Sequence, residues 1–214
     1  MKKAFNIVFE DDFLIVVDKI AKILIQPSPK KEKNTLTLLL RREKNQKVFP
    51  CHRLDRETTG LIIYAKTQAI QEKIMEQFKI GEVKKKYIAF IQGRLKNKTG
   101  ILEGYIIDKE GQKFGEKHKK AKTFYKVLRQ ADNFSVVELK PSTGRTNQLR
   151  IQFAKINNPI LGEDRYAFRR DFKVKFKRLA LHAYFLSFIH PSSGDRVDLN
   201  INLPEDMDRF LKQH

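Results

Sequence analysis

The stretch HRLDRETTGLIIYAKT, residues 52–67, joins a charged loop to a strongly apolar run. Asp55 lies between Arg53 and Arg56, and two threonines and Gly60 follow it. Neighbouring cations favour the ionised form of an aspartate, which suits a nucleophile or an electrostatic stabiliser better than a general acid. The ordinary alternative is that Asp55 only caps the turn after it. The stretch therefore predicts a strand preceded by a loop that presents one carboxylate.

Other runs along the chain share the short, apolar, β-branched or aromatic character of a strand. We expect strands in FNIVFE (5–10), FLIVVDK (13–19), LIIYAK (61–66), YIAFIQG (87–93), KTFYKVL (122–128), FSVVELK (134–140), HAYFLSFIH (182–190) and RVDLNINL (196–203). Turn-like connections such as PSTG and HPSSGD favour hairpins over parallel crossovers. The predicted fold class is α+β, with a mixed, mainly antiparallel bent β-sheet flanked by helices and loops.

Helical periodicity appears in four runs. They are TLTLLLRREK (35–44), AIQEKIMEQFK (69–79), RTNQLRIQFAKI (145–156) and EDMDRFLKQ (205–213). In the third run, Leu149, Phe153 and Ile156 form the expected buried stripe, and Arg150 lies at its edge, able to reach a cleft. With 214 residues the chain is expected to form a single globular domain over 1–214.

The charge of the chain is strongly positive. Lysine and arginine number 44 against 25 acidic residues, a formal net charge of +19. Such a field attracts polyanions, and RNA or DNA gains affinity from phosphate neutralisation alone. A lysine-rich surface that serves only solubility is the alternative. We expect the basic segment 167–178 to be a loop that orders on a partner, or equally a solvated strand edge.

Several classes of protein do not fit the sequence. The N-terminus meets acidic residues before any signal-like apolar core, and no run approaches the ~20 apolar residues of a membrane span. Cys51, the single cysteine, fits a reducing cytoplasm and is expected to be a small packed residue rather than the partner of His52. The five histidines are scattered without metal-ligand spacing, so no metal site is expected.

The opening stretch is similar to the HRLDxxTSG signature of the RluA-type pseudouridine synthases. Three later segments resemble further blocks of that family in the same order: KKKYIAFIQG (84–93), LKPSTGRTNQLRIQFAKINNPILGEDRYAF (139–168) and LALHAYFLSFIHPSSG (179–194). The segment FEDDFLIVVDKIAKILIQPSP, residues 9–29, is similar to the family's opening block. The resemblance covers residues 5 to about 203 and implies a pseudouridine synthase fold, here without an S4-type RNA-binding domain.

The resemblance also implies an activity and its catalytic residues. The family needs no cofactor and converts uridine in RNA to pseudouridine by breaking the bond between base and sugar, turning the base and rejoining it through C5. Asp55 matches the family nucleophile, Tyr87 the tyrosine that stacks on uracil, and Arg150 the arginine that pairs with the catalytic aspartate. Whether the aspartate attacks C1′ or removes a sugar proton stays open.

Three further residues are expected to bind the substrate. Arg53 matches an arginine that enters the base stack when the target base flips, and a phosphate contact is the equal alternative. Leu149 is expected to pack beside the base. Arg145, which follows Gly144 at an expected helix start, is read as a phosphate contact.

The chain departs from the family pattern at Asn147 and Gln152, which replace histidines, and at Glu163, which replaces an aspartate. We expect an RNA partner, rRNA or tRNA, with no DNA and no membrane, and a cytoplasmic monomer. A non-catalytic RNA-binding or ribosome-assembly protein on the same fold is the rival interpretation. A uracil-removing glycosylase is a second rival, although the signature stretch offers no paired carboxylate to activate water.

Overall fold

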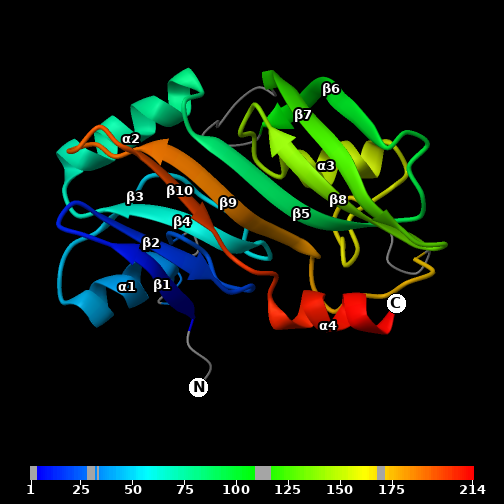
Figure 1. The fold of residues 1–214 in the computed structure, drawn as a ribbon, viewed down its shortest axis with the longest axis horizontal. Helices are drawn as coiled ribbons and strands as arrows, with labels where there is room; N and C mark the ends of the chain where they lie inside the picture. The colour runs from blue at the N-terminus through cyan, green and yellow to red at the C-terminus, as the bar shows by residue number, and fades with distance from the viewer. Residues whose placement is uncertain (1–3, 28–31, 33, 109–116, 168–171) are drawn as a thin grey trace. The chain divides into compact units, whose positions relative to one another are not determined.

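The computed structural model describes residues 4–27, 32, 34–108, 117–167 and 172–214 (Figure 1). Contacts within the chain divide it into two compact units. Unit 1 comprises Met1–Lys85 and Ala183–Pro204, and unit 2 comprises Lys86–His182 and Glu205–His214. The single catalytic domain expected over 1–214 stays a prediction.

Unit 1 is a set of antiparallel strands with two helices. The strands are β1 (Phe5–Glu10), β2 (Leu14–Lys19), β3 (Phe49–Pro50), β4 (Thr59–Ala65), β9 (Leu181–Ile189, from Ala183 on) and β10 (Arg196–Asn200). β2 pairs with β1 and β4, β4 also pairs with β3, and β9 pairs with β10, all antiparallel. The apolar core gathers residues from β2, β4, α2 and β9, among them Val16, Ile63, Ile74 and Phe188.

A threonine precedes each helix of unit 1 and caps its first turn. In α1 (Leu36–Lys44) the Thr35 side chain accepts a hydrogen bond from the Leu38 N–H, and in α2 (Gln68–Ile80) Thr67 accepts from Ile70. A side-chain oxygen at this position satisfies one of the N–H groups that the first helical turn leaves without a carbonyl. Ile70 and Ile74 are the buried residues of α2, as its periodicity predicts.

Unit 2 contains four neighbouring strands (Figure 1). These are β5 (Lys84–Gln92, from Lys86 on), β6 (Thr99–Asp108), β7 (Lys117–Gln130) and β8 (Phe134–Pro141), joined antiparallel in the order β5-β8-β7-β6. Helix α3 (Gln148–Lys155) packs on one face, where Phe153 meets the ring of Tyr125 at 6.3 Å. We call this the α3 face, and the opposite one the outer face.

Helix α4 (Glu205–Gln213) covers the β5 and β8 part of the outer face. The Phe210 ring lies 5.5 Å from Phe90 and 5.1 Å from Phe134, ring centre to ring centre. The buried Arg178 side chain donates two hydrogen bonds of 2.6 Å to Asp206 near the start of the helix. An aromatic cluster and a bidentate ion pair therefore hold α4 on unit 2.

The predicted α+β class with a mainly antiparallel sheet is confirmed, and all four expected helices are present. Three details differ. β6 was not predicted as a strand. α3 begins at Gln148 rather than at Arg145, and Ile156 is an exposed residue at its C-terminal end rather than part of the buried stripe. No described helix is long and apolar enough to cross a membrane.

The basic segment 167–178 falls partly outside the described residues, at 168–171. In its described part, Phe172 and Arg178 are buried, and the ring of Phe176 contacts Phe90 and Phe210. Lys173, Lys175 and Lys177 are exposed between these anchors. Residues 172–178 form neither a helix nor a strand, so the strand-edge alternative is wrong for them.

Candidate active site

Asp55 lies in unit 1, in the loop that joins β3 to β4. Leu54 is buried beside it, Asp55 is half-buried, and Arg53 and Arg56 are exposed. The N–H of Thr58 donates to the Asp55 carbonyl at 3.1 Å, which closes a tight turn just before β4. Buried Leu54 thus anchors the loop, while Asp55 stays half-buried and Arg53 exposed.

A buried lysine, Lys19, holds this loop through hydrogen bonds to backbone carbonyls. Lys19, at the end of β2, has no exposed surface, and its Nζ donates to the carbonyls of Ile20, Ile23 and Arg56 at 2.9, 3.0 and 3.1 Å. The Lys22 N–H donates to the same Arg56 carbonyl at 2.8 Å. A buried ammonium needs such partners because desolvation would otherwise make its charge very costly. Lys19 thereby ties the residue after Asp55 to the end of β2.

At position 60, where this loop enters β4, only glycine fits. Its φ is +116°, and a Cβ there would lie 2.2 Å from the Ala183 carbonyl oxygen. Thr58, two residues earlier, has a buried hydroxyl without a hydrogen-bond partner among the described residues. Gly60 therefore lets the backbone of β9 approach that of β4 closely.

His52 and Cys51 do not form a reactive pair. Burial and, to a smaller extent, the charge of Lys85 lower the pKa of His52 to about 3, so the ring is neutral and its Nε2 accepts from the Ile63 N–H at 3.1 Å. Burial raises the pKa of the Cys51 thiol to about 12. The packed role expected for Cys51 is confirmed.

In unit 2, Tyr87 lies on the α3 face. Tyr87 in β5 pairs with Leu139 in β8, and Leu139 pairs with Tyr125 in β7. Directly paired residues of neighbouring strands project to the same side of a sheet. Tyr125 contacts Phe153 of α3, so Tyr87, Leu149 and Arg150 belong to the same side of unit 2.

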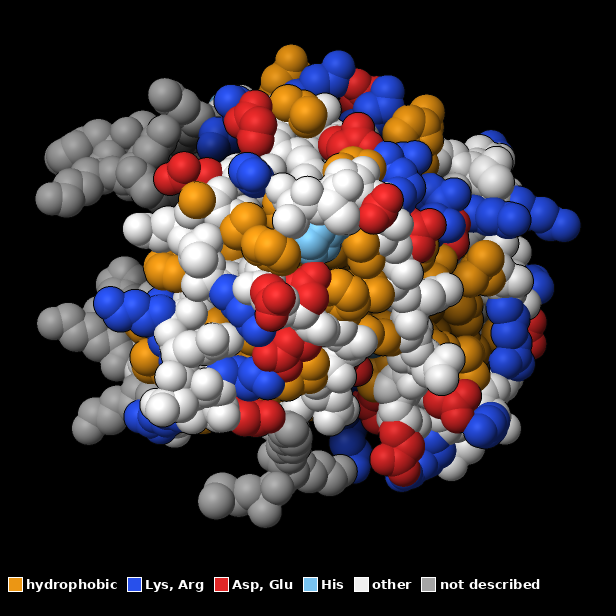
Figure 2. All heavy atoms as spheres, turned by 60° about the vertical axis from the view of Figure 1, so that its left-hand side comes forward, with side chains coloured by type: hydrophobic (Ala, Val, Ile, Leu, Met, Phe, Trp, Pro, Cys, Tyr) orange, Lys and Arg blue, Asp and Glu red, His pale blue; other side chains and the backbone are white. Residues whose placement is uncertain are grey.

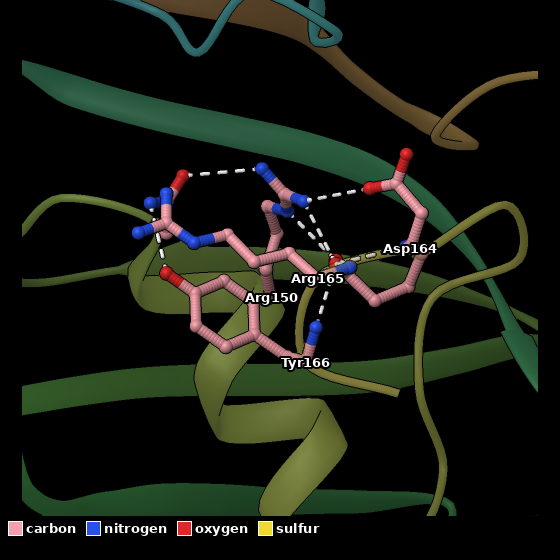
Figure 3. Close-up of polar contacts among 6 residues, drawn as sticks. Arg150, Asp164, Arg165 and Tyr166 are labelled. Carbon is pink, nitrogen blue, oxygen red and sulfur yellow. Dashed lines mark hydrogen bonds and ion pairs between the residues drawn. The ribbon is translucent and has the colours of Figure 1, made fainter. Parts of the chain in front are cut away.

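Arg150 forms a two-pronged ion pair with Glu163 (Figure 3). Its Nε and Nη2 donate to Glu163 Oε2 and Oε1, both at 2.7 Å, and Nη2 lies 3.6 Å from the Asp164 carboxylate. Nη1 donates to the side chain of Asn147 at 3.2 Å. Arg150 is 8% exposed and Glu163 has no exposed surface. The fork fixes the plane of the guanidinium.

Glu163 is itself held by the backbone around it. Its Oε1 accepts from the N–H groups of Asp164, Arg165 and Tyr166 at 3.1, 2.8 and 3.1 Å. Burial alone would raise the pKa of Glu163, but the hydrogen bonds and charge of Arg150 and these N–H groups outweigh it and lower the pKa below its usual value. The carboxylate is therefore a fixed anion.

Asn147 and Tyr166 complete the network around the guanidinium (Figure 3). Asn147 donates from Nδ2 to the Tyr166 hydroxyl at 3.0 Å, and the Arg150 guanidinium carbon lies 5.4 Å from the Tyr166 ring centre. Asn147 adopts a left-handed conformation with φ of +53°, which asparagine tolerates better than most residues. Gly162, which precedes Glu163, could not carry a Cβ, because Arg178 O would be 1.7 Å away.

The remaining expected site residues have distinct surroundings. Arg145 precedes α3, and its Nε donates to the Lys120 carbonyl at 3.2 Å while its N–H donates to Gln148. Leu149 is buried on α3. Gln152 bonds Thr123 at 2.6 Å and the Leu102 carbonyl at 2.8 Å, so it fastens α3 to β6 and β7.

The structure thus groups part of the expected site. Tyr87, Leu149 and Arg150 share one face of unit 2, where Arg145 also lies, and Asp55 and Arg53 belong to unit 1. Sequence reasoning missed Lys19 as a support of the Asp55 loop and Glu163 as the partner of Arg150. The only sequence signal for Lys19 and Glu163 was that each is a charged residue inside a segment that resembles a block of the family.

Figure 2 draws one face of the molecule with its charged side chains coloured by sign. On the face drawn in Figure 2, basic and acidic side chains are interspersed among exposed apolar ones. The net charge of +19 is therefore not gathered on that face. Within the described ranges, no three His, Cys, Asp or Glu side chains are grouped so that they could hold a metal ion.

Comparison with known proteins gives consistent matches. The family model for RNA pseudouridylate synthase matches residues 13–155. The tRNA pseudouridine synthase C of Haemophilus ducreyi is 32% identical, and the match covers 97% of this chain and 95% of that protein. The ribosomal large subunit pseudouridine synthase D of Xanthomonas campestris pv. campestris is 30% identical, with 96% of this chain and 68% of that protein covered.

The fold also matches a solved structure. The human RNA pseudouridylate synthase domain containing 4 superposes with a TM-score of 0.80 at 23% sequence identity. That match covers 97% of this chain and 92% of the human one. At this level of identity the likeness establishes the fold.

Proposed function

Because this chain belongs to the RNA pseudouridylate synthase family, we propose that it isomerises particular uridines of rRNA or tRNA to pseudouridine. One similar relative is named for tRNA and another for the large ribosomal subunit, so both RNA classes belong in the proposal. We further propose that the protein acts in the cytoplasm as a monomer and needs no cofactor.

The reaction rearranges bonds within one nucleoside. The bond between N1 of uracil and C1′ of ribose breaks, the base turns, and a bond forms between C5 and C1′. The hydrogen on C5 leaves as a proton and N1 gains one, so the atoms of the product equal those of the substrate. The target base must first leave its stack, which costs a few kcal/mol.

In our proposal Asp55 is the carboxylate that meets the ribose, either by attack on C1′ or by removal of a sugar proton. Tyr87 holds the uracil ring against its aromatic face. Arg150 pairs with the Asp55 carboxylate and keeps it ionised. A guanidinium has five N–H donors, so Arg150 can donate to Glu163 and to a second carboxylate at the same time.

The other expected residues bind the RNA around the target. Leu149 packs beside the flipped base. Arg53, exposed on the same loop as Asp55, either fills the space that the base leaves or contacts a phosphate. Arg145 contacts a phosphate, with its guanidinium placed by the Lys120 carbonyl.

The observation that supports this function best is the pre-arranged Arg150. Its guanidinium is oriented by Glu163, Asn147 and Tyr166 on the same face of unit 2 that carries Tyr87. A fixed guanidinium and a tyrosine on one face are suited to hold an anion and a flat base together. A protein that only bound phosphates would gain little from burying this arginine with Glu163 and surrounding it with Asn147 and Tyr166.

The decisive experiment follows the hydrogen on C5. Total RNA labelled with tritium at C5 of uridine is prepared from a strain that lacks the gene, and its rRNA and tRNA are incubated separately with the purified protein. We expect tritium in water, pseudouridine in the RNA and no free uracil. Free uracil would indicate a glycosylase. Tight binding of both RNA pools without tritium release would indicate a non-catalytic RNA-binding protein.

A further inference from the structure

The outer face of β6 and β7 exposes apolar side chains where a soluble sheet usually carries polar ones. Ile101 and Tyr105 on β6 are 51% and 62% exposed, and Phe124 on β7 is 41% exposed. On the same strands Ile106, Ala121 and Thr123, which project to the α3 face, are buried. Alternation along the two strands thus separates a packed face from an exposed apolar one.

The pairing register places these exposed side chains together. Ile101 lies opposite Phe124, and Tyr105 lies opposite Lys120. Between these two pairs, Glu103 lies opposite Lys122. Directly opposed residues have Cβ atoms ~5 Å apart, so the three pairs form one continuous strip.

Five lysines lie within this strip or beside it. Lys120, Lys122 and Lys126 lie on β7, Lys140 of β8 pairs with Phe124, and Lys86 of β5 lies 3.9 Å from Glu138 of β8. Lys122 Nζ stands 5.4 Å from the centre of the Phe124 ring. We call these five lysines with Ile101, Glu103, Tyr105, Phe124 and Glu138 the outer strip. Its formal charge is +3, because two glutamates offset two of the five lysines.

The outer strip is separate from the proposed catalytic residues of unit 2. Tyr87, Leu149 and Arg150 belong to the α3 face, whereas the residues of the strip project to the opposite side of the same strands. Helix α4 covers the outer face near Phe90 and Phe134. Tyr105 and Phe124 remain exposed.

We propose that the outer strip binds an unpaired segment of the substrate RNA at a distance from the target uridine. This inference rests on the proposed function, since it takes RNA as the partner. Two bases stack on Tyr105 and Phe124, and the neighbouring phosphates pair with lysines. Aromatic faces flanked by ammonium groups are the combination that binds single-stranded RNA without strong sequence preference.

The charge of the strip favours RNA over a protein partner. An apolar protein surface laid on Phe124 would have to desolvate the Lys122 ammonium group together with the Glu103 carboxylate 3.5 Å from it, and burying such an ion pair is costly. RNA supplies phosphates at that point. A second copy of this chain would bring another +3 surface against the first if the two strips met face to face, and the lysines would repel.

The test compares two double variants. In Tyr105→Ser with Phe124→Ser, the stacking surfaces of the strip are lost. In the control, Met75→Ser with Ile80→Ser, two side chains of α2 that are 49% and 68% exposed are changed in the same way. Binding of a fluorescein-labelled 20-nucleotide oligouridylate and of unmodified rRNA and tRNA is measured by anisotropy, and thermal unfolding confirms that both variants fold.

We expect the strip variant to bind oligouridylate about ten-fold or more weakly, because stacking on an aromatic side chain contributes that much per base. The control should bind like the unchanged protein. Single-turnover tritium release at saturating enzyme should be unchanged in both variants, because neither change touches the α3 face. Lys126→Ala with Lys140→Ala should lower the salt dependence of binding.

Other outcomes would overturn the inference. Unchanged affinity of the folded strip variant for all three RNAs would do so. So would a dimer of the unchanged protein, seen by sedimentation, that is lost in the strip variant while RNA affinity stays the same. Tritium release is read separately: if the unchanged protein releases tritium, the proposed function stands whether or not the strip binds RNA. If it binds RNA through the strip without release, only the function fails.

Discussion

At the scale of single residues, the Asp55 carboxylate is the group on which the proposed chemistry depends. Asp55→Asn keeps the volume of the side chain but removes its charge. We expect turnover to be lost while RNA binding persists or tightens, because an anion that repels phosphate disappears. Single-turnover tritium release and anisotropy measure the two properties. Measurable turnover in a preparation free of unchanged enzyme would contradict the assignment.

Glu163 acts through Arg150. Glu163→Gln removes the anion that receives both prongs of the guanidinium and leaves Arg150 without its fully buried partner. Breaking a buried ion pair costs ~3–5 kcal/mol of stability. A misplaced guanidinium should also lower the single-turnover rate roughly 10²-fold with little change in RNA affinity.

The control for this prediction is Glu163→Asp, which keeps the charge and restores the residue type of the matching family block. It should recover much of the rate and of the unfolding free energy, both measured beside Glu163→Gln. Equal rates for the unchanged protein and Glu163→Gln would show that the fork has no catalytic role.

His52 makes folding sensitive to acid. Its pKa falls from about 6.5 in an unfolded chain to about 3 in the folded protein. The unfolded state therefore binds the extra proton first. Neutral His52 therefore contributes fully to the free energy of unfolding above pH ~6.5. This contribution is lost as the pH falls towards 3, at up to ~1.4 kcal/mol per pH unit.

Urea unfolding at several pH values measures this effect in the unchanged protein and in His52→Gln, whose amide oxygen can still accept from Ile63. The difference between the two unfolding free energies should shrink as the pH falls below 6.5. A difference that is constant from pH 7 to pH 4 would mean that His52 does not titrate with folding.

At the scale of elements, the close approach of β9 to β4 depends on Gly60. Gly60→Ala would place a Cβ 2.2 Å from the Ala183 carbonyl oxygen at a φ of +116°. We expect a loss of more than ~3 kcal/mol of unfolding free energy, or failure to fold, because backbone atoms cannot move aside easily. Gly104→Ala on β6 is the matched control, since its Cβ would meet nothing within 4 Å. Chemical denaturation of both variants is the measurement, and equal stability would contradict the steric account.

The strands and helices show where sequence patterns suffice. The sequence predicts α2 well because Ile70 and Ile74 recur at helical spacing and Thr67 caps the first turn. β6 was missed because Gly100 and Gly104 interrupt it and because both of its faces carry apolar side chains, which hides the alternation. Ile156 fits the helical period of α3, but the helix ends at Lys155.

At the scale of the whole molecule, the net charge of +19 should make RNA binding depend strongly on salt. Lys173, exposed between the buried Phe172 and Arg178, is a candidate phosphate contact. Lys173→Ala should reduce the slope of log affinity against log salt by ~0.7–0.9, the value for one lost phosphate contact. Single-turnover chemistry should not change. Anisotropy titrations across a range of KCl concentrations measure the slope, and a lower rate at saturating enzyme would assign Lys173 more than an electrostatic role.

The sequence by itself determined the class of fold and the family, because local periodicity and ordered motifs are properties of neighbouring residues. It also indicated Asp55, Tyr87 and Arg150 as candidate catalytic residues. Only the tertiary structure decided that Glu163 holds Arg150, that Lys19 reaches the Arg56 carbonyl, and that Gly60 admits the backbone of Ala183. These contacts join residues 13, 37 and 123 positions apart in the chain. Such pairs are brought together by burial and strand pairing, and no local pattern records which buried charge will find which partner.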